Sequence, residues 1–229
     1  MNEVERYHSR RRTARIAGAY YAVLALALFP QMIRDRLIVA GDVAATGQNI
    51  LAHALVFRMS IFGDLVCQIA FLALVLYLYH LLKDVGREAA RLMLALVLVA
   101  VPIAMLSASN ELVALALLQG NDPAQAMLFL GLFKDGILIA ELFWGLWLFP
   151  LGWLFFKSGF MPKTLGILLM AGCFGYLAPA FAGLVLPDWQ ALLAQGVALS
   201  GVAELATVVW LLAVGVKRPT REQRSPITA

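Results

Sequence analysis

Charged residues are scarce in this sequence of 229 residues, of which Asp, Glu, Lys and Arg make up only 14%. Soluble domains contain about a quarter charged residues and are about half apolar. In this chain 62% of the residues are hydrophobic and the mean hydropathy is +0.83. The composition therefore excludes an ordinary soluble domain and indicates a protein that lies within a membrane.

Cysteine and histidine are also rare. The two cysteines, Cys67 and Cys173, both lie within apolar runs, so neither a disulfide framework nor a CxxC metal site is supported. The three histidines, His8, His53 and His80, do not have the spacing of metal ligands. We therefore expect neither a bound metal nor a cofactor.

The chain is basic, with a net charge of +4 and a pI near 9.3. Nucleic-acid binding is not indicated, because the basic residues flank apolar runs and form no stripe or recognition motif. Membrane orientation explains the excess of positive charge better. The expected partner is the lipid bilayer, and the sequence is compatible with a small solute or lipid ligand and with a homo-oligomer.

Six apolar runs are each long enough to cross the hydrocarbon core of a bilayer. They lack the alternating pattern of a barrel strand, so each is predicted to be a helix that satisfies its own backbone hydrogen bonds. We expect the first run to be an uncleaved span and not a signal peptide, because no small-x-small cleavage site follows it. The runs cover residues 16–33, 57–82, 92–118, 133–156, 165–186 and 192–216.

The distribution of Lys and Arg predicts the orientation of these spans. Fourteen of the eighteen lie on one side of a six-span arrangement: five before residue 16, three at 83–91, two at 157–163 and four after residue 216. The predicted fold is therefore an all-α polytopic membrane protein of six transmembrane helices with both termini in the cytoplasm. Its parts are a basic N-terminal segment (1–15), a six-span membrane domain (16–216) and a basic tail (217–229).

The connection at residues 34–56 is then the main external segment. Asp42 is placed as a helix N-cap, and Ile50, Leu51, Ala54 and Leu55 follow at helical spacing. We expect residues 42–55 to form a short helix that packs over the mouth of the bundle. In this position Thr46 and Asn49 are predicted to cap or bond to the ends of spans.

Several polar residues lie at membrane depth, where unpaired charges are costly and usually functional. Asp64 and Gln68 share one helix face, Asn110 and Glu111 lie on a polar face of the third span, and Lys134 and Glu141 share a face of the fourth. Arg58 precedes Asp64 on another face. We expect these residues to face one another across a central cleft that opens outward.

Glu204 lies near the middle of the sixth span. It belongs to a stripe of small and polar residues, together with Gly196, Ser200 and Thr207. Because no basic residue lies near it in its own span, Glu204 is the strongest candidate for a functional group. We expect it to face the bundle interior, within reach of polar groups from the second, third or fourth span.

Two interpretations of these residues remain open. They are a site for a small solute, ion or lipid, or they are a structural ion-pair cluster of Arg58, Asp64, Glu141 and Lys134 that sets the register of the helices. Small residues such as Gly196 and Ser200 are also ordinary at sites of close helix packing.

Motifs of known membrane and hydrolytic enzymes are absent. The sequence has neither an HExxH zinc helix nor a GxSxG elbow. Binding or conduction of a small solute, ion or lipid is therefore the leading function. The alternatives are an intramembrane enzyme that uses Asp64, Glu141 or Glu204 as acid or base, and a structural or sensory partner of another membrane protein.

Two stretches of sequence resemble a known family. The first joins Asp42, Thr46, Asn49 and Ile50 to Leu55-Val56-Phe57-Arg58, and the second runs from Phe143-Trp144-Gly145 through Phe149-Pro150 to Gly175-Tyr176. They are similar to the signature of the bacterial integral-membrane family catalogued as domain of unknown function 4386, over residues 15–216. The resemblance implies a multi-pass protein of the bacterial inner membrane, and it supplies no activity and no catalytic residue.

Overall fold

A computed structural model describes residues 3–26 and 28–217 of the chain. All the regular structure in these residues is helical. The elements in chain order are α1 (Glu3–Leu26), α2 (Leu28–Asp35), α3 (Val43–Ala52), α4 (Ala54–Leu82), α5 (Arg87–Gln119), α6 (Pro123–Ser158), α7 (Lys163–Val185), α8 (Pro187–Leu193), a short 3-10 turn η1 (Ala194–Gly196) and α9 (Val197–Ala213).

Six helical stretches in the described residues are long and apolar enough to cross a membrane, which confirms the predicted fold class. Lipid offers the backbone no hydrogen-bond partner, so apolar runs of this length become helices whatever their side-chain order. The stretches are Val4–Asp35, Ala54–Leu82, Arg87–Gln119, Pro123–Ser158, Lys163–Val185 and Pro187–Ala213.

The first span differs from its predicted bounds. Helix α1 begins at Glu3, so the basic N-terminal residues belong to the same helix as the first apolar run. It ends at Leu26, and α2 continues the span to Asp35. The predicted basic tail lies, apart from Lys217, outside the described residues.

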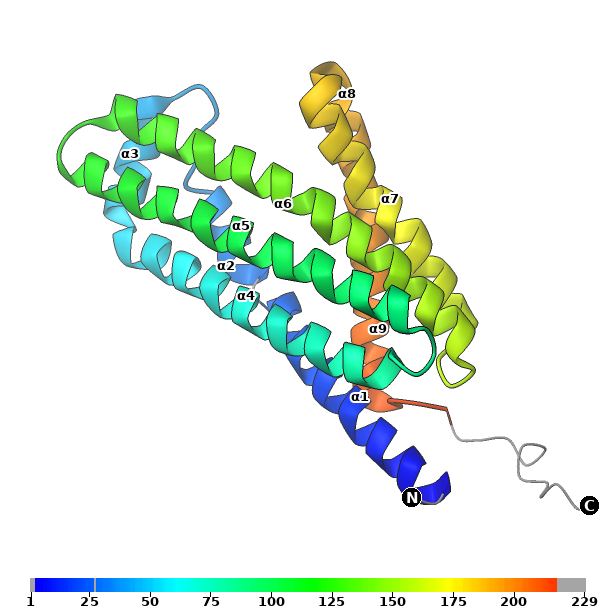
Figure 1. The fold of residues 1–229 in the computed structure, drawn as a ribbon. Coiled ribbons are helices and arrows are strands. Elements are labelled where there is room, and N and C mark those ends of the chain that lie inside the picture. Colours follow the sequence, from blue (N-terminus) through cyan, green and yellow to red (C-terminus); the bar gives the residue numbers. More distant parts are fainter. Residues whose placement is uncertain (1–2, 27, 218–229) are drawn as a thin grey trace, which may run out of the picture.

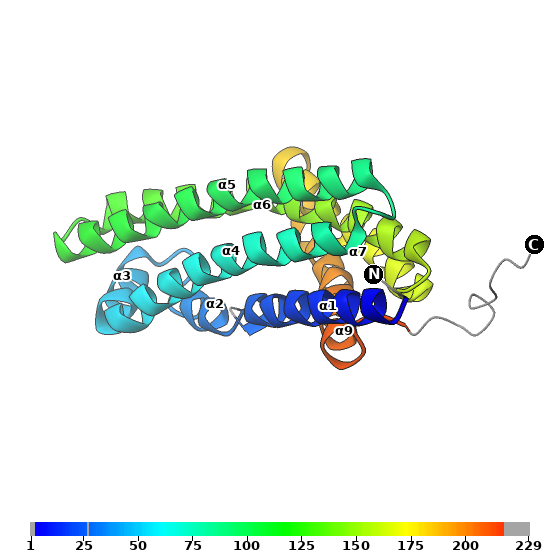
Figure 2. The ribbon, with the colours of Figure 1, turned by 60° about the horizontal axis from the view of Figure 1, so that its bottom comes forward.

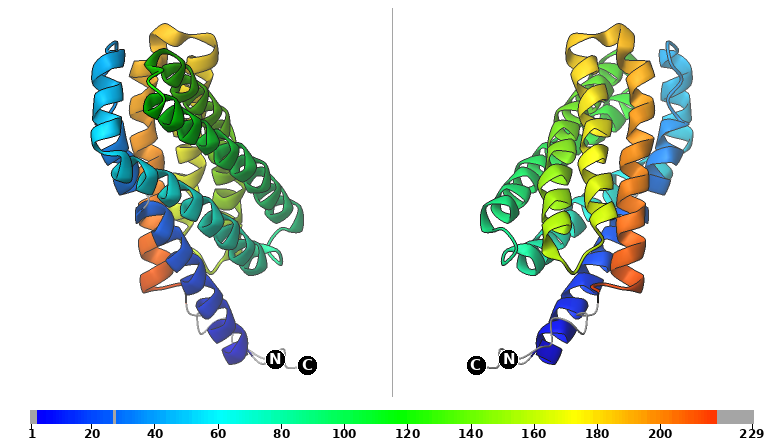
Figure 3. Two further views of the ribbon diagram at one scale, coloured as in Figure 1. Left: turned by 90° about the vertical axis from the view of Figure 1, so that its left-hand side faces the viewer. Right: turned by 90° about the vertical axis from the view of Figure 1, so that its right-hand side faces the viewer.

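The long helices form a closed ring. Each contacts two neighbours, in the order α1, α4, α5, α6, α7, α9 and back to α1. Figure 1 shows α4, α5 and α6 side by side, with α7 at the right beside the second half of α6 and α9 behind them. Figure 3 shows α3 and α8 at one end, and the start of α1 and the finish of α9 at the other. The two ends of the bundle are therefore covered by different elements.

Most basic residues in the described part of the chain gather at the end that holds the start of α1. The last turn of α9 lies beside α1 at this end (Figure 2), where Arg11 Nε donates to Val214 O (3.3 Å). The backbone N–H of Lys217 donates to Phe160 O in the α6–α7 loop (2.8 Å). The two ends of the membrane domain and this loop are thus tied together on one face.

Apolar side chains both fill the bundle and cover its outside. A large buried cluster, with Trp147 and Phe155 among its members, occupies the end near the α1 start, and a smaller one around Phe57 and Leu115 lies beneath α3. Large apolar side chains also point outward, such as Leu106, which is 73% exposed. An apolar exterior of this extent is suited to contact with the acyl chains of a lipid bilayer.

Candidate functional site

A polar cleft of about 540 Å³ lies inside the ring, between mid-bundle and the end that carries α3 and α8. We call it the central cleft. Seven helices contribute to its wall. Its polar and aromatic lining consists of Gln31, Arg34 and Asp35 from α2, Asp64 and Gln68 from α4, Phe133, Lys134, Asp135, Glu141 and Trp144 from α6, Tyr176 from α7 and Gln190 from α8.

An arginine-centred cluster forms one wall of the central cleft. Arg34 Nη1 donates to Asp64 Oδ2 of α4 (2.5 Å) and to Glu111 Oε2 of α5 (3.2 Å). Gln31 Nε2 donates to the other oxygen of Asp64 (2.8 Å). The side chains of Arg34 and Glu111 are only 6% and 1% exposed, and the guanidinium lies over the ring of Phe133. A single guanidinium therefore serves both carboxyl groups, and all three groups are removed from water together.

Side chains of the external segment bind the backbone of the connection that follows α2. Asp42 Oδ1 accepts a hydrogen bond from Ala45 N (2.9 Å), which starts α3 as predicted. Thr46 Oγ1 accepts from Val39 N and donates to Val39 O, and Asn49 Nδ2 donates to Leu37 O (3.3 Å).

The expectation that Thr46 and Asn49 bond to the ends of spans is wrong in its partners. Both side chains bind the backbone of the short connection that follows α2. The external helix therefore fastens this connection, which begins two residues after Arg34. Backbone groups beyond the end of a helix lack intrahelical partners, and here side chains of α3 bind some of them.

Three buried polar atoms in the wall of the central cleft have no hydrogen-bond partner among the described residues: Arg34 Nε, Gln68 Oε1 and Trp144 Nε1. Gln68 is 7% exposed, and its Oε1 atom makes no hydrogen bond. The indole Nε1 of Trp144 is also buried without an acceptor. One is an acceptor and the other a donor, and both residues line the same cleft. A buried polar atom without a partner costs free energy, so these two atoms are suited to a bound polar molecule.

Glu204 lies beside the central cleft and does not line it. Tyr21 Oη of α1 donates to its Oε1 (2.9 Å), and Tyr176 Oη of α7 donates to its Oε2 (3.0 Å). The inward orientation agrees with the prediction, but the partners come from the first and fifth spans and not from the second, third or fourth. Tyr176 also lines the cleft, so it connects the Glu204 carboxyl to the cavity.

Close packing of α7 against α9 explains the contact between Tyr176 and Glu204. Ser200 Oγ of α9 donates to Gly172 O of α7 (2.5 Å), where the absence of a Cβ atom on Gly172 lets the two backbones approach. The two helices are antiparallel, and side chains lean toward the N-terminus of their own helix. Tyr176 and Glu204, each one turn beyond this contact, therefore lean toward each other.

The remaining predicted residues occupy different positions. Lys134 and Glu141 line the central cleft without an ion pair to another described residue. Arg58 is exposed and Asn110 is half-buried, and neither lines the cleft. The proposed cluster of Arg58, Asp64, Glu141 and Lys134 is thus replaced by one in which Arg34 pairs with Asp64 and Glu111.

Sequence reasoning missed Arg34, because it treated this residue as the external end of the first span. A signal was present: two carboxylates at membrane depth, Asp64 and Glu111, had no basic residue on their own helix faces. Arg34 was one of only four Lys or Arg residues left outside the basic side of the bundle. Tyr21 and Tyr176 gave no comparable signal, because tyrosine is common in membrane helices near the interface.

Among the residues that the structure describes, no group of three or more His, Cys, Asp or Glu side chains is arranged to hold a metal ion. The central cleft instead offers hydrogen-bonding groups and charges of both signs, next to the aromatic rings of Phe133, Trp144 and Tyr176. This chemistry suits binding of a small molecule by hydrogen bonds and ring contacts.

Comparison with known proteins adds one finding. The family model described as Domain of unknown function (DUF4386) matches residues 16–215, which is most of the chain and all of the central cleft. The comparisons with curated proteins and with solved structures found no match.

Proposed function

Since this chain belongs to the DUF4386 family, whose description assigns no activity, we propose a function from its geometry: the central cleft binds or conducts a small solute, ion or lipid. The observation that carries this proposal is the pair of unpartnered polar atoms, Gln68 Oε1 and Trp144 Nε1, in one cavity of about 540 Å³. Pockets for small molecules are commonly of this size.

The same pair of atoms favours a small polar solute over a bare ion. A solute with one donor and one acceptor can bind the Gln68 oxygen and the Trp144 N–H together. A cation cannot accept a hydrogen bond from the indole N–H. Glu141 and Lys134 add one charge of each sign to the wall. Arg34 Nη1 already binds Asp64 and Glu111, so the role of the Arg34 cluster in this proposal is to hold α2, α4 and α5 around the cavity.

A copurification experiment tests the proposal. The detergent-purified chain is extracted with organic solvent and the extract is analysed by mass spectrometry, in parallel with the variants Gln68→Leu and Trp144→Phe. We expect a compound present in about equimolar amount with the parent to fall at least about fivefold in both variants, because each leaves a buried polar group of the compound without its partner, at a cost of about 1–3 kcal/mol.

The matched control is Ile139→Ala, which alters an outward-facing side chain of α6 that does not line the central cleft. The control should retain the compound at the parent level. If the extracts of parent and variants contain the same compounds in the same amounts, no compound is held by Gln68 and Trp144. The proposal then fails.

We also propose that the end with the start of α1 faces the cytoplasm of a bacterial inner membrane, so that the central cleft opens outward. The excess of Lys and Arg at this end supports the orientation. In a chain with Cys67→Ser and Cys173→Ala, we expect Glu141→Cys to react with an impermeant thiol reagent added to intact cells. Asp84→Cys, in the α4–α5 turn, should react only after permeabilisation.

Ile139→Cys is the internal control, because a thiol that faces lipid does not ionise and should not react under either condition. Labelling of Asp84→Cys in intact cells would reverse the orientation. Equal labelling of Glu141→Cys and Ile139→Cys would show that the cleft is not a distinct water-filled opening.

A further inference from the structure

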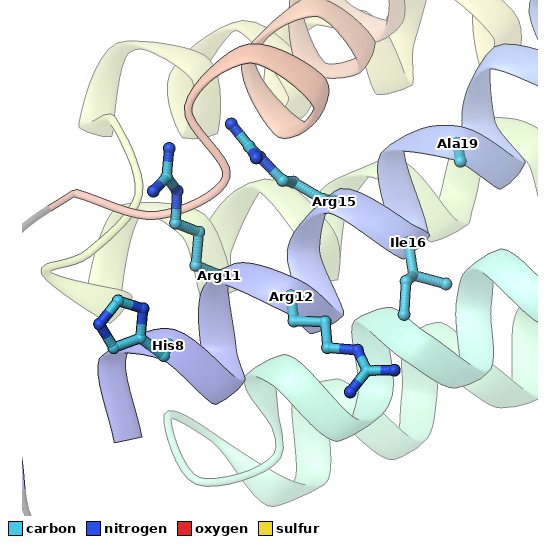
Figure 4. Close-up of a pocket in the computed structure, with 6 residues that line it drawn as sticks. All are labelled: His8, Arg11, Arg12, Arg15, Ile16 and Ala19. Carbon is cyan, nitrogen blue, oxygen red and sulfur yellow. The ribbon is translucent and has the colours of Figure 1, made fainter. Parts of the chain in front are cut away.

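A second hollow lies on the outward face of α1, at the opposite end of the bundle from the central cleft. It has a volume of about 420 Å³ and is lined by His8, Arg11, Arg12, Arg15, Ile16 and Ala19 (Figure 4). We call it the α1 basic pocket. These six residues recur at spacings of three, four and seven, so they form one face of the helix. No acidic residue is among those that line it.

Two of its arginines are held by the end of α9. Arg11 Nε donates to Val214 O (3.3 Å), and Arg15 donates through Nη2 to Ala213 O (3.1 Å). These carbonyls end a helix and have no intrahelical donor, so guanidinium groups are suitable partners. In Figure 4 both side chains point toward the last turn of α9, whereas Arg12 points away from it. Each of the two guanidiniums keeps further N–H groups available.

Arg12 and His8 complete the cationic part of the pocket. Both are exposed, and Arg12 makes no hydrogen bond or ion pair with any part of the chain that the structure describes. Arg12 therefore has all five of its N–H donors free for an external anion. The planar fork of arginine matches the geometry of a phosphate group, which it binds through two parallel hydrogen bonds.

The pocket changes character along the helix axis. Its basic residues occupy the two turns that precede the apolar run, and Ile16 and Ala19 lie in the turns that follow. From Arg12 to Ala19 the helix rises by roughly 10 Å. This order, charge first and apolar wall next, matches a lipid molecule whose phosphate lies at the membrane surface and whose acyl chain lies just below it.

We propose that the α1 basic pocket binds the phosphate headgroup of an anionic phospholipid. Arg12 binds the phosphate, Arg11 and Arg15 add positive charge on the same helix face, and the upper part of one acyl chain lies against Ile16 and Ala19. The site is separate from the central cleft and does not depend on its function.

The test uses the full chain in dodecyl maltoside micelles, with native mass spectrometry as the readout of bound lipid. Phosphatidylglycerol, phosphatidylcholine with the same acyl chains and inorganic phosphate are the three probes. We expect one phosphatidylglycerol to be retained at least about fivefold better than phosphatidylcholine, since a basic residue near a membrane surface contributes about a fivefold preference for anionic lipid.

The informative variant is Arg12→Gln, because Arg11 and Arg15 also hold α9 and their replacement would disturb packing. We expect about a fivefold loss of phosphatidylglycerol with no change in the midpoint of thermal unfolding of lipid-free protein. The matched control is Arg6→Gln, which removes the same charge from an exposed residue of α1 that does not line this pocket and should keep the parent's retention.

Equal losses in Arg12→Gln and Arg6→Gln would overturn the proposal in favour of unspecific surface charge. Equal retention of the two lipids would overturn it as well. Displacement of phosphatidylglycerol by millimolar inorganic phosphate would identify a simple anion site and reject the lipid.

Discussion

Replacement of Arg34 by alanine should destabilise the protein by about 3–5 kcal/mol, because it leaves two buried carboxylates without their shared cation. Asp64 would keep only its bond from Gln31, and Glu111, whose side chain is 1% exposed, would keep no partner in the cluster. The measurement is the free energy of unfolding in mixed micelles, followed by helical circular dichroism as denaturing detergent is added.

Two arginines serve as controls for Arg34→Ala. Arg36 lies two residues further on and is exposed, and Arg58 is exposed near the start of α4. Alanine at either position should change the free energy of unfolding by no more than about 0.5 kcal/mol. If Arg34→Ala is no worse than these two, the arginine-centred cluster does not hold α2, α4 and α5 together.

A triple variant separates the effect of unbalanced charge in the Arg34 cluster from the effect of lost side-chain volume. Arg34→Met with Asp64→Asn and Glu111→Gln removes all three charges while it retains similar volumes. Neutral replacement of a whole buried ion cluster is often tolerated, whereas removal of one member is not. We therefore expect the triple variant to be more stable than Arg34→Ala. The opposite ranking would show that individual hydrogen bonds matter more than charge balance.

Replacement of Glu204 by alanine should have the second largest effect, a loss of about 2–4 kcal/mol. The change leaves the hydroxyls of Tyr21 and Tyr176 without an acceptor, and each unsatisfied buried group costs about 1–3 kcal/mol. Glu204→Gln keeps one carbonyl oxygen in the same place and should lose about half as much. The free energy of unfolding in mixed micelles is again the measurement.

Glu204 variants also report on the central cleft, because Tyr176 lies between the carboxyl and the cavity. If Glu204 positions Tyr176 for a ligand, Glu204→Gln and Tyr176→Phe should both lower the retention of the copurified compound. The control is Leu205→Ala, an outward-facing neighbour that is 58% exposed in the parent. A Glu204→Ala chain that is as stable and retains as much compound as the parent would remove Glu204 from both roles.

Sequence and structure agree where a residue's environment follows from its own stretch of chain. The external helix illustrates this, because Asp42 caps α3 through a bond to Ala45, only three residues away. The family motif at Asp42, Thr46 and Asn49 was likewise recognised from sequence. Its purpose was not, because Leu37 and Val39 were not expected to be its partners.

The candidate site shows where local patterns stop being informative. Helical spacing correctly put Asp64 and Gln68 on one face of α4, and both line the central cleft. It gave no means of choosing between Arg34, Arg58 and Lys134 as the cation for Asp64. That choice depends on how far each helix is rotated and on which helices are neighbours in the ring.

The sequence by itself determined that this protein is a bundle of six membrane helices with its basic residues at one end, because lipid leaves a long apolar run no other way to satisfy its backbone. The tertiary structure alone decided which deep polar groups meet. Arg34 reaches Glu111 across 77 positions of the chain, and Tyr21 reaches Glu204 across 183. Such pairs depend on ring order and helix rotation, and on the cost of leaving any charge unpaired in an apolar interior.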